Sequence, residues 1–199
     1  KLFYLPPYSP EFNPDEYLNQ DYKSNVHKNG LPKNQKELKE NTQNYKSWPI
    51  GKELGVSPWL VLDQVRINAF GAITDDLEPL HTNAEWCMQN SPYKTPISYG
   101  FLTLSLLTKF INEVTDNALK GDENNLSYPL NYGFDKIRFL APVKSGSKIR
   151  GRFVLRDLKS KPEGDLMLFD AIVEIEHEEK PALIAQWLSL WVNRTNENY

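Results

Sequence analysis

The chain has 199 residues, enough for one well-buried domain with an appended segment but short for two full domains. Its hydrophobic content of 40%, with 5 Trp, 10 Tyr and 9 Phe, predicts a packed core and excludes a chain that is disordered throughout. The net charge of -3 gives no general case for nucleic-acid binding, because phosphate contacts require a basic excess.

Cysteine usage and apolar stretches indicate the compartment. The single cysteine, Cys87, excludes an internal disulfide framework and favours a reducing compartment. No cluster of Cys and His has the spacing of a metal site, so we expect neither a metal nor another cofactor. The longest apolar stretch, 181–192, is shorter than the roughly 20 residues that cross a bilayer. Because residues 1–5 lead straight into prolines without a signal-peptide core, we expect a soluble, cytoplasmic protein.

Residues 1–47 differ in character from the rest of the chain. They hold prolines at 6, 7, 10, 14 and 32 and many Asn and Lys residues, with little apolar periodicity. The stretch 33–46 can form a short polar helix, but its single leucine, Leu38, cannot bury much surface. We therefore expect a weakly structured appended segment at 1–47 and a globular domain at 48–199.

Part of this first segment has a resemblance of its own. Residues 5–17, LPPYSPEFNPDEY, resemble the end of the catalytic domain of insertion-sequence transposases related to the Tc1/mariner group, and the similarity covers about residues 1–45. In that family the last of three metal-holding carboxylates follows the Asn-Pro pair, where Glu16 matches. Two-metal chemistry needs carboxylates from several strands, and the strands for the other two are absent. The segment is interpreted as a transposase remnant, and a nucleic-acid-processing role rests on it alone.

From Trp48 onward the chain reads as regular structure. Asp63 can cap a helix, since Asp is a preferred N-cap residue. The apolar residues that follow are spaced to form one stripe of this helix: Val65, Ile67, Ala69, Phe70 and Ile73. The helix places Asp76 at its C-terminal end, five residues before His81. On spacing alone, a carboxylate and an imidazole so placed are most often a surface pair.

A second helix starts near Ser98 and continues to about Thr115. Its apolar residues lie almost all round it, which predicts a central helix buried on most sides. If Ser98 caps this helix, Gly100 falls in the first turn, where an amide has no intrahelical partner. That N–H can point at a developing oxyanion, helped by the helix dipole. Alternatively, Gly100 simply permits tight helix packing.

After Asn131 the pattern changes to period two. Apolar and charged residues alternate over 148–156 and 169–176, which is typical of half-exposed antiparallel strands. Three turn signals separate the strands, at 144–147, 162–165 and 178–181. Basic residues on the first polar face (Lys148, Arg150, Arg152, Arg156) oppose acidic ones on the second (Asp170, Glu174, Glu176). We expect cross-strand ion pairs; a basic stripe that binds coenzyme A phosphates or nucleic acid is the alternative.

Together these elements predict an α+β chain. A buried helix precedes three or four long antiparallel strands, and a first strand is predicted at 59–62. The sheet has one face to bury, and the apolar helix is the element able to bury it. An antiparallel sheet wrapped around a central helix is the hot-dog fold, which often dimerises through its sheet edges.

Three motifs in order resemble MaoC-like dehydratases, specifically the nodulation-protein-N-like branch. They are Asp76-x-x-x-x-His81, the helix start YGFLTLSL at 99–106, and NYGFDKIRF at 131–139 followed by Ala141-Pro142-Val143. The similarity extends over about residues 48–193. It implies a hot-dog fold, a homodimer or higher homo-oligomer, and a place in fatty acid metabolism. It also implies reversible hydration of trans-2-enoyl thioesters to (R)-3-hydroxyacyl thioesters, carried by coenzyme A or acyl carrier protein.

The resemblance assigns roles to residues of this chain. Adding water across a conjugated thioester needs a base, an acid and donors for the enolate oxygen. We expect Asp76 to be the principal base, His81 to position the water, and the Gly100 amide to bind the thioester oxygen. Ser98 and Tyr99 at the helix start are also expected to line the oxyanion and substrate site, and Thr108, two turns further on, adds a polar contact to substrate.

Two positions depart from the family pattern. Glu78 stands where hydratases of this group often carry Asn, and Tyr99 stands where His is common before the glycine. The first departure affects a secondary polar contact, and the second alters the shape of the pocket. They keep a second hypothesis open, a hot-dog protein that binds acyl thioesters but has lost turnover.

Overall fold

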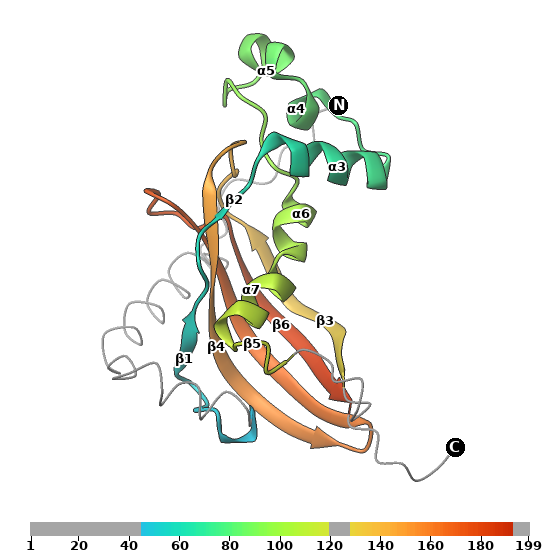
Figure 1. Cartoon of the computed structure of the whole chain (residues 1–199), viewed down its shortest axis with the longest axis vertical. Coiled ribbons are helices and arrows are strands. Elements are labelled where there is room, and N and C mark those ends of the chain that lie inside the picture. Colours follow the sequence, from blue (N-terminus) through green and yellow to red (C-terminus); the bar gives the residue numbers. More distant parts are fainter. Residues whose placement is uncertain (1–44, 120–127, 193–199) are drawn as a thin grey trace, which may run out of the picture.

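The computed structural model describes residues 45–119 and 128–192. Four long strands dominate it: β3 (Tyr128–Phe139), β4 (Lys148–Lys161), β5 (Gly164–Ile175) and β6 (Leu183–Val192). They belong to one antiparallel sheet of order β1-β4-β5-β6-β3. Strand β1 (Glu53–Val56) lies at one edge, and the short β2 (Leu60–Val61) also pairs with β4. The other edge is β3 (Figure 1).

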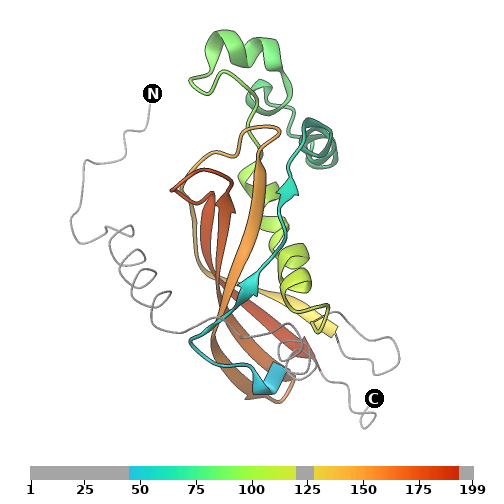
Figure 2. The same cartoon turned by 60° about the vertical axis from the view of Figure 1, so that its left-hand side comes forward.

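Two consecutive helices lie along the inner face of this sheet. Helix α6 (Gly100–Ser105) and helix α7 (Leu107–Val114) are separated only by Leu106, and the curved strands pass behind both (Figures 1 and 2). Their buried side chains are Leu102, Thr103, Leu107, Phe110, Ile111 and Val114. A sheet that curves around a central helix is the hot-dog fold, so the predicted fold class is confirmed.

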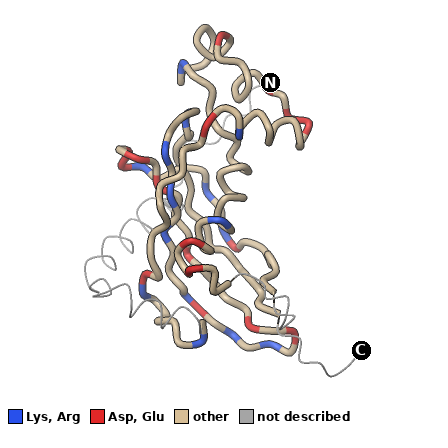
Figure 3. Tube along the Cα trace, viewed as in Figure 1, with Lys and Arg blue, Asp and Glu red and all other residues tan. Residues whose placement is uncertain are grey.

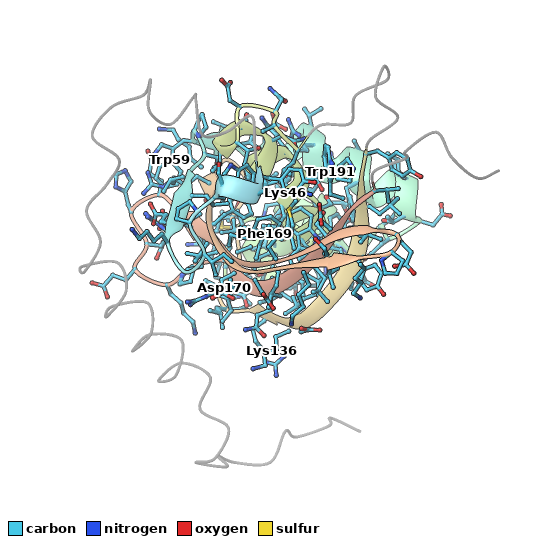
Figure 4. All side chains as sticks on the ribbon, turned by 90° about the horizontal axis from the view of Figure 1, so that it is seen from below. Lys46, Trp59, Lys136, Phe169, Asp170 and Trp191 are labelled. Carbon is cyan, nitrogen blue, oxygen red and sulfur yellow. The ribbon has the colours of Figure 1, made fainter. Side chains whose placement is uncertain are left out.

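Helix α7 can approach the sheet closely because β4 carries a glycine beneath it. A Cβ added to Gly151 would lie 2.6 Å from the Cβ of Phe110, which no side chain tolerates. The rest of the inner face is apolar, as the alternation predicts. Figure 4 shows Phe169 in the interior and its neighbour Asp170 on the outer face.

The prediction of a helix buried on most sides is wrong. Phe101 is 71% exposed, and Thr108 and Lys109 are exposed as well. The sheet covers one side of α6 and α7, and within residues 45–119 and 128–192 no second layer covers the opposite side. The apolar residues on that side therefore remain at the surface of a single chain.

Three helices lie together at one end of the sheet: α3 (Gln64–Thr74), α4 (Pro79–Thr82) and α5 (Ala84–Asn90) (Figure 1). Asp63 caps α3 as predicted, since its Oδ1 accepts a hydrogen bond from the Arg66 amide at 2.8 Å. The predicted stripe is only partly right, because Ile67 is buried whereas Val65 and Ile73 are exposed. Helix α3 lies beyond the end of the sheet and has less surface to pack against.

None of the helices in the described residues is long and apolar enough to cross a membrane.

The outer face of β4 and β5 carries a ladder of ion pairs. Arg150 Nε lies 2.6 Å from a carboxylate oxygen of Glu174, its direct cross-strand partner, and Arg152 Nε lies 2.9 Å from the other oxygen. Arg156 Nε lies 2.5 Å from Asp170, and Lys148 pairs with Glu176. Both signs of charge are interspersed along the strands (Figure 3). The predicted cross-strand pairs are confirmed, and every cation of the basic stripe has a carboxylate partner.

The short 3-10 helix η2 (Tyr45–Ser47) packs on the far end of the sheet. The Tyr45 hydroxyl donates to Asp165 Oδ2 at 2.7 Å, and the ring lies 5.7 Å from that of Trp191. Residues just before the predicted boundary at 47/48 thus contact β5 and β6. The boundary itself stays a prediction, because residues 1–44, which include Glu16 and the transposase-like sequence, lie outside the described residues.

Candidate active site

Asp76 lies in an exposed turn that follows α3. Asp75 ends the helix in the left-handed region with φ of 56°, and the amides of Asp75 and Asp76 both donate to the carbonyl of Gly71. Aspartate is among the few non-glycine residues that adopt this conformation readily. The Asp76 carboxylate accepts a hydrogen bond from the Glu78 amide at 3.3 Å. The turn therefore leaves the carboxylate at the surface, with one long hydrogen bond from the described part of the chain.

His81 lies on the short helix α4, which begins at Pro79. Its Nδ1 is 2.7 Å from the carbonyl oxygen of Ile97. A carbonyl can only accept, so Nδ1 carries the proton and Nε2 of the neutral ring is left with a free lone pair. Nε2 has no hydrogen-bond partner among the described residues. The backbone thereby selects the tautomer of His81 and leaves one basic nitrogen open.

Tyr99 joins these two segments. Its hydroxyl donates to the backbone carbonyl of Asp76 at 2.5 Å, and its ring centroid lies 3.9 Å from that of His81. On its other side the ring is 5.3 Å from that of Phe70. The side chain is 4% exposed. Burial first, and then the charges of Asp76 and Glu78, raise the pKa of Tyr99, so its hydroxyl stays protonated at neutral pH.

Gly71 makes room for this tyrosine. A Cβ added at position 71 would lie 2.3 Å from the Tyr99 hydroxyl and 2.7 Å from the Asp76 carbonyl oxygen. Gly71 was not among the predicted site residues. A single glycine inside a helix is a weak signal in the sequence, because the reason for it is the contact with Tyr99, which lies 28 positions later.

The start of α6 differs from the prediction at one residue. Tyr99, not Ser98, is the N-cap residue, and no side chain caps the helix. Ser98 is held elsewhere: its hydroxyl donates to the Tyr99 carbonyl at 3.1 Å, and its amide donates to Val143 at 2.7 Å. Ser98 is displaced from the cap because its backbone is tied to the strand-like segment at Val143.

Gly100 is the first residue of α6. Its amide donates to no backbone carbonyl among the described residues, as is usual for a first helical position. A Cβ added here would lie 2.9 Å from the ring of Phe139 on β3, so the glycine also permits close packing. Both predicted uses of this glycine, an open amide and a close approach, therefore fit its surroundings.

Thr108 lies apart from the cluster around Tyr99. It is exposed, and within the described residues no hydrogen bond joins it to the other predicted site residues. It lines a cavity of about 280 Å³ between α6–α7 and the strands β3 and β6. The cavity is formed by Phe101, Leu104, Ser105, Leu107, Thr108, Asn131, Phe134 and Trp187. Because Phe101 follows Gly100 directly, one end of this groove lies beside the start of α6.

The predicted site residues thus form two groups: a cluster around Tyr99, with Asp76 and His81, and Thr108, which lies apart in the cavity. Tyr99 contacts the segments that carry Asp76 and His81, while no hydrogen bond joins the Asp76 carboxylate to the His81 imidazole within the described chain.

No group of three or more His, Cys, Asp and Glu residues in the described parts is arranged to hold a metal ion. Cys87 is buried, its Sγ lies 3.4 Å from the carbonyl oxygens of Pro79 and Leu80 on α4, and burial raises the pKa of its thiol.

The sequence matches two known family models. A family model described as "MaoC like domain" matches residues 43–173. A second model, described as "DDE superfamily endonuclease", matches residues 1–39, outside the described part of the chain. The transposase resemblance of that segment has this match in its favour and otherwise stays a prediction.

Curated relatives and solved structures agree with the first match. Nodulation protein N of Rhizobium meliloti is 39% identical over 71% of this chain and 85% of that protein. The 3-hydroxyacyl-thioester dehydratase Z of Mycobacterium tuberculosis is 31% identical over 71% of this chain and 90% of its own length.

Among solved structures, R-hydratase PhaJ1 of Pseudomonas aeruginosa matches 75% of this chain and 86% of its own, with a TM-score of 0.58 at 18% identity. A protein from Archaeoglobus, described as a monoamine oxidase regulatory protein, matches 76% of this chain and 94% of its own with a TM-score of 0.60 at 22% identity. These two structural similarities show the fold. The match to the family model and the curated relatives show the family. The chain belongs to the MaoC-like domain family, whose members include hydratases and dehydratases.

Proposed function

We propose that this protein catalyses the reversible hydration of trans-2-enoyl thioesters to (R)-3-hydroxyacyl thioesters, with Asp76 and His81 as its acid/base pair. One observation carries the proposal: His81 Nδ1 is 2.7 Å from the Ile97 carbonyl, which leaves Nε2 free to hold a water molecule. The exposed Asp76 carboxylate, five residues earlier, can take a proton from that water.

In the proposed reaction Asp76 and His81 act on the water, and the Gly100 N–H binds the thioester oxygen. Asp76 removes a proton from the water held by His81 as the water oxygen bonds C3 of the enoyl thioester. The π electrons move to the thioester oxygen, where the Gly100 N–H stabilises the enolate. The protonated Asp76 returns its proton to C2 on the same face, which gives the 3-hydroxyacyl thioester. Dehydration follows the same steps in reverse.

The groove along α6 and α7 is the site that we propose for the acyl tail. It starts at Phe101, next to Gly100, and continues to Thr108, whose hydroxyl is the polar contact expected from the resemblance. Its volume of about 280 Å³ lies just below the range of about 300–1,000 Å³ that is usual for ligand pockets. A short acyl chain fits this space best. The carrier is coenzyme A or acyl carrier protein.

The assembly that we propose is a homodimer or a higher homo-oligomer. Strand β3 forms an edge of the sheet with no partner strand among the described residues. It carries the exposed apolar side chains Leu130, Tyr132 and Phe139, and the ring of Phe139 lies 6.1 Å from that of the exposed Phe101. A long, apolar, unpaired edge is rare in a monomer, and a second copy can cover it by pairing along β3. Light scattering after size-exclusion chromatography is expected to give at least twice the mass of one chain.

A second candidate function is binding of acyl thioesters without turnover. It rests on Glu78, which occupies the position of a common Asn, and on Tyr99, which occupies that of a common His. The regulatory protein among the structural neighbours is a precedent for a family fold with a role other than catalysis. Tight binding of acyl-coenzyme A together with no measurable hydration would favour this candidate.

The direct test is hydration of crotonyl-coenzyme A, followed by loss of the enoyl absorbance. We expect turnover by the natural sequence, and a decrease in kcat of about 100-fold or more in Asp76→Asn and in His81→Ala. Gln64→Ala, which removes a hydrogen bond to the backbone of His81 but no reacting group, is expected to lower kcat far less. Unchanged rates in both dyad variants would refute the assigned roles.

A further inference from the structure

We infer that Tyr99 is the positioning residue of the Asp76–His81 pair, an inference that rests on the proposed function. Tyr99 contacts both residues of the pair through one side chain. Its hydroxyl donates to the Asp76 carbonyl, and its ring lies 3.9 Å from the His81 imidazole. The next residue, Gly100, carries the amide proposed for the thioester oxygen. Tyr99 therefore links the three segments that carry the base, the water-holding imidazole and the oxyanion donor.

A direct chemical role for the hydroxyl fits the structure less well. Tyr99 is 4% exposed, and its single O–H proton is already donated to the Asp76 carbonyl at 2.5 Å. A substrate oxygen would have to displace that contact and reach a buried atom. The hydroxyl therefore acts on the reaction through Asp76 and does not touch the reacting atoms.

The hydrogen bond of Tyr99 and its ring contact constrain different residues. The hydrogen bond holds the backbone of Asp76 itself. The rest of the turn is held by the amide bonds to Gly71, by the 3.3 Å contact at Glu78, and by the Thr82 hydroxyl, which donates to the carbonyls of Leu77 and Glu78. The ring contact fixes the plane of the imidazole, whose Nδ1 donates a hydrogen bond to the carbonyl oxygen of Ile97. With both contacts in place, the Asp76 carboxylate and the His81 Nε2 lone pair keep a constant relation to Gly100.

Gly71 is the structural counterpart of Tyr99. Any side chain at position 71 would collide with the Tyr99 hydroxyl and with the Asp76 carbonyl, at 2.3 and 2.7 Å from its Cβ. Position 71 also supplies the carbonyl that accepts the amides of Asp75 and Asp76. Gly71, Asp76 and Tyr99 therefore form one unit, and a change at either end moves the turn that carries the carboxylate.

Two variants of Tyr99 separate the two contacts. Tyr99→Phe keeps the ring and removes the hydroxyl, so we expect kcat to fall about tenfold with KM within about twofold. Tyr99→Leu removes both, so we expect a larger decrease in kcat. Tyr93→Phe is the matched control, because Tyr93 lies in the loop after α5 and its hydroxyl makes no hydrogen bond within the described part of the chain. The control is expected to keep the kcat of the natural sequence.

A second measurement needs no turnover. Long-range ¹⁵N spectra of the ring nitrogens report the tautomer of His81, one of 3 histidines in the chain. We expect a single Nδ1–H tautomer in the natural sequence and in Tyr99→Phe, and a mixture of tautomers in Tyr99→Leu. If no enoyl thioester is hydrated by the natural sequence, the proposed function fails, while these spectra still decide whether Tyr99 orients the ring.

The coupling between Gly71 and Tyr99 completes the test. Gly71→Ala is expected to lower kcat about 100-fold, since a displacement of about 1 Å at a reacting group costs that much. The same change in a Tyr99→Phe background is expected to cost at least about fivefold less, because the hydroxyl that collides is gone. Urea denaturation of all variants shows whether they are folded under the assay conditions. Additive effects, or a Tyr99→Phe variant that raises KM with kcat unchanged, would overturn the inference.

Discussion

The indole N–H of Trp187 on β6 donates to the side-chain carbonyl of Asn131 on β3 at 2.7 Å. Trp187 is 5% exposed and packs between Phe134 and Phe169, so its N–H has little access to water. Asn131 belongs to the motif at 131–139, and both residues line the groove beside α7. A hydrogen bond between side chains thus holds the wall of the groove at the edge strand of the sheet.

Removing this acceptor is expected to destabilise the protein. Asn131→Leu leaves the buried indole N–H without a partner, which lowers the free energy of unfolding by about 1–3 kcal/mol. Asn131→Asp keeps an acceptor oxygen in the same place and is expected to cost less. Urea denaturation measures both, and a Leu variant as stable as the natural sequence would show that the bond contributes nothing.

Filling the groove is expected to shorten the acyl chains that are accepted. Ser105→Phe places a ring in the cavity, so kcat/KM for trans-2-octenoyl-coenzyme A should fall at least about tenfold more than for crotonyl-coenzyme A. Lys109→Phe adds a similar ring to an exposed position of α7 outside the groove and serves as the control. Equal losses for both substrates in Ser105→Phe would place the acyl tail elsewhere.

The contact between Tyr45 and Asp165 predicts a pH-dependent stability. Burial raises the pKa of Asp165, but the hydrogen bonds from Ser160 and Tyr45 and the Lys46 ammonium outweigh it, so the pKa lies below its usual value. A lowered pKa adds stability above the unfolded value of about 3.9, and that stability is lost as pH falls through the folded pKa.

Tyr45→Phe removes one of these donors and keeps the ring on Trp191. We expect the free energy of unfolding to fall by about 1.5–3 kcal/mol at pH 7, as for hydrogen bonds to charged groups, with a smaller loss below pH 4. Urea midpoints at a series of pH values measure it. A loss that is the same at pH 7 and pH 3 would mean that the Asp165 charge is not involved.

The tautomer of His81 is itself a prediction that can be tested in the resting protein. Because Nδ1 donates to Ile97, ¹⁵N spectra of the neutral ring should show Nδ1 protonated and Nε2 unprotonated. His177 is exposed, has no such backbone acceptor within the described chain, and provides the internal control. A His81 ring protonated at Nε2 would remove the basis for water binding there.

Much of the fold follows from local patterns in the sequence. Period-two alternation predicted β4 and β5, and Asp63 marked the start of α3 because its cap contact spans only three residues. The long apolar run at 181–192 is β6, buried on both faces toward its end. Strand β1 was missed, since Glu53–Val56 is short and lacks alternation, and β2 is shorter than the predicted 59–62.

The site is less predictable than the fold. Asp76, His81 and Gly100 were found from motifs, but no periodicity indicates that Tyr99 reaches a carbonyl 23 residues earlier. Ser98 was expected to cap α6, yet its bond to Val143, 45 positions away, places it outside the helix. The exposure of Phe101 was also missed, because an apolar residue on a central helix predicts burial until the extent of the sheet is known. Each miss depends on a contact between distant segments.

The space that Gly71 leaves for Tyr99 has a consequence for how this family can diverge. Because a methyl group at position 71 would meet both the tyrosine hydroxyl and the Asp76 carbonyl, the two positions cannot drift independently. Relatives with tyrosine before the helix glycine are expected to retain glycine at the position equivalent to 71. Where a shorter ring such as histidine stands there, alanine or serine becomes tolerable only if the aspartate turn has also moved. The pair of positions should therefore covary across the family.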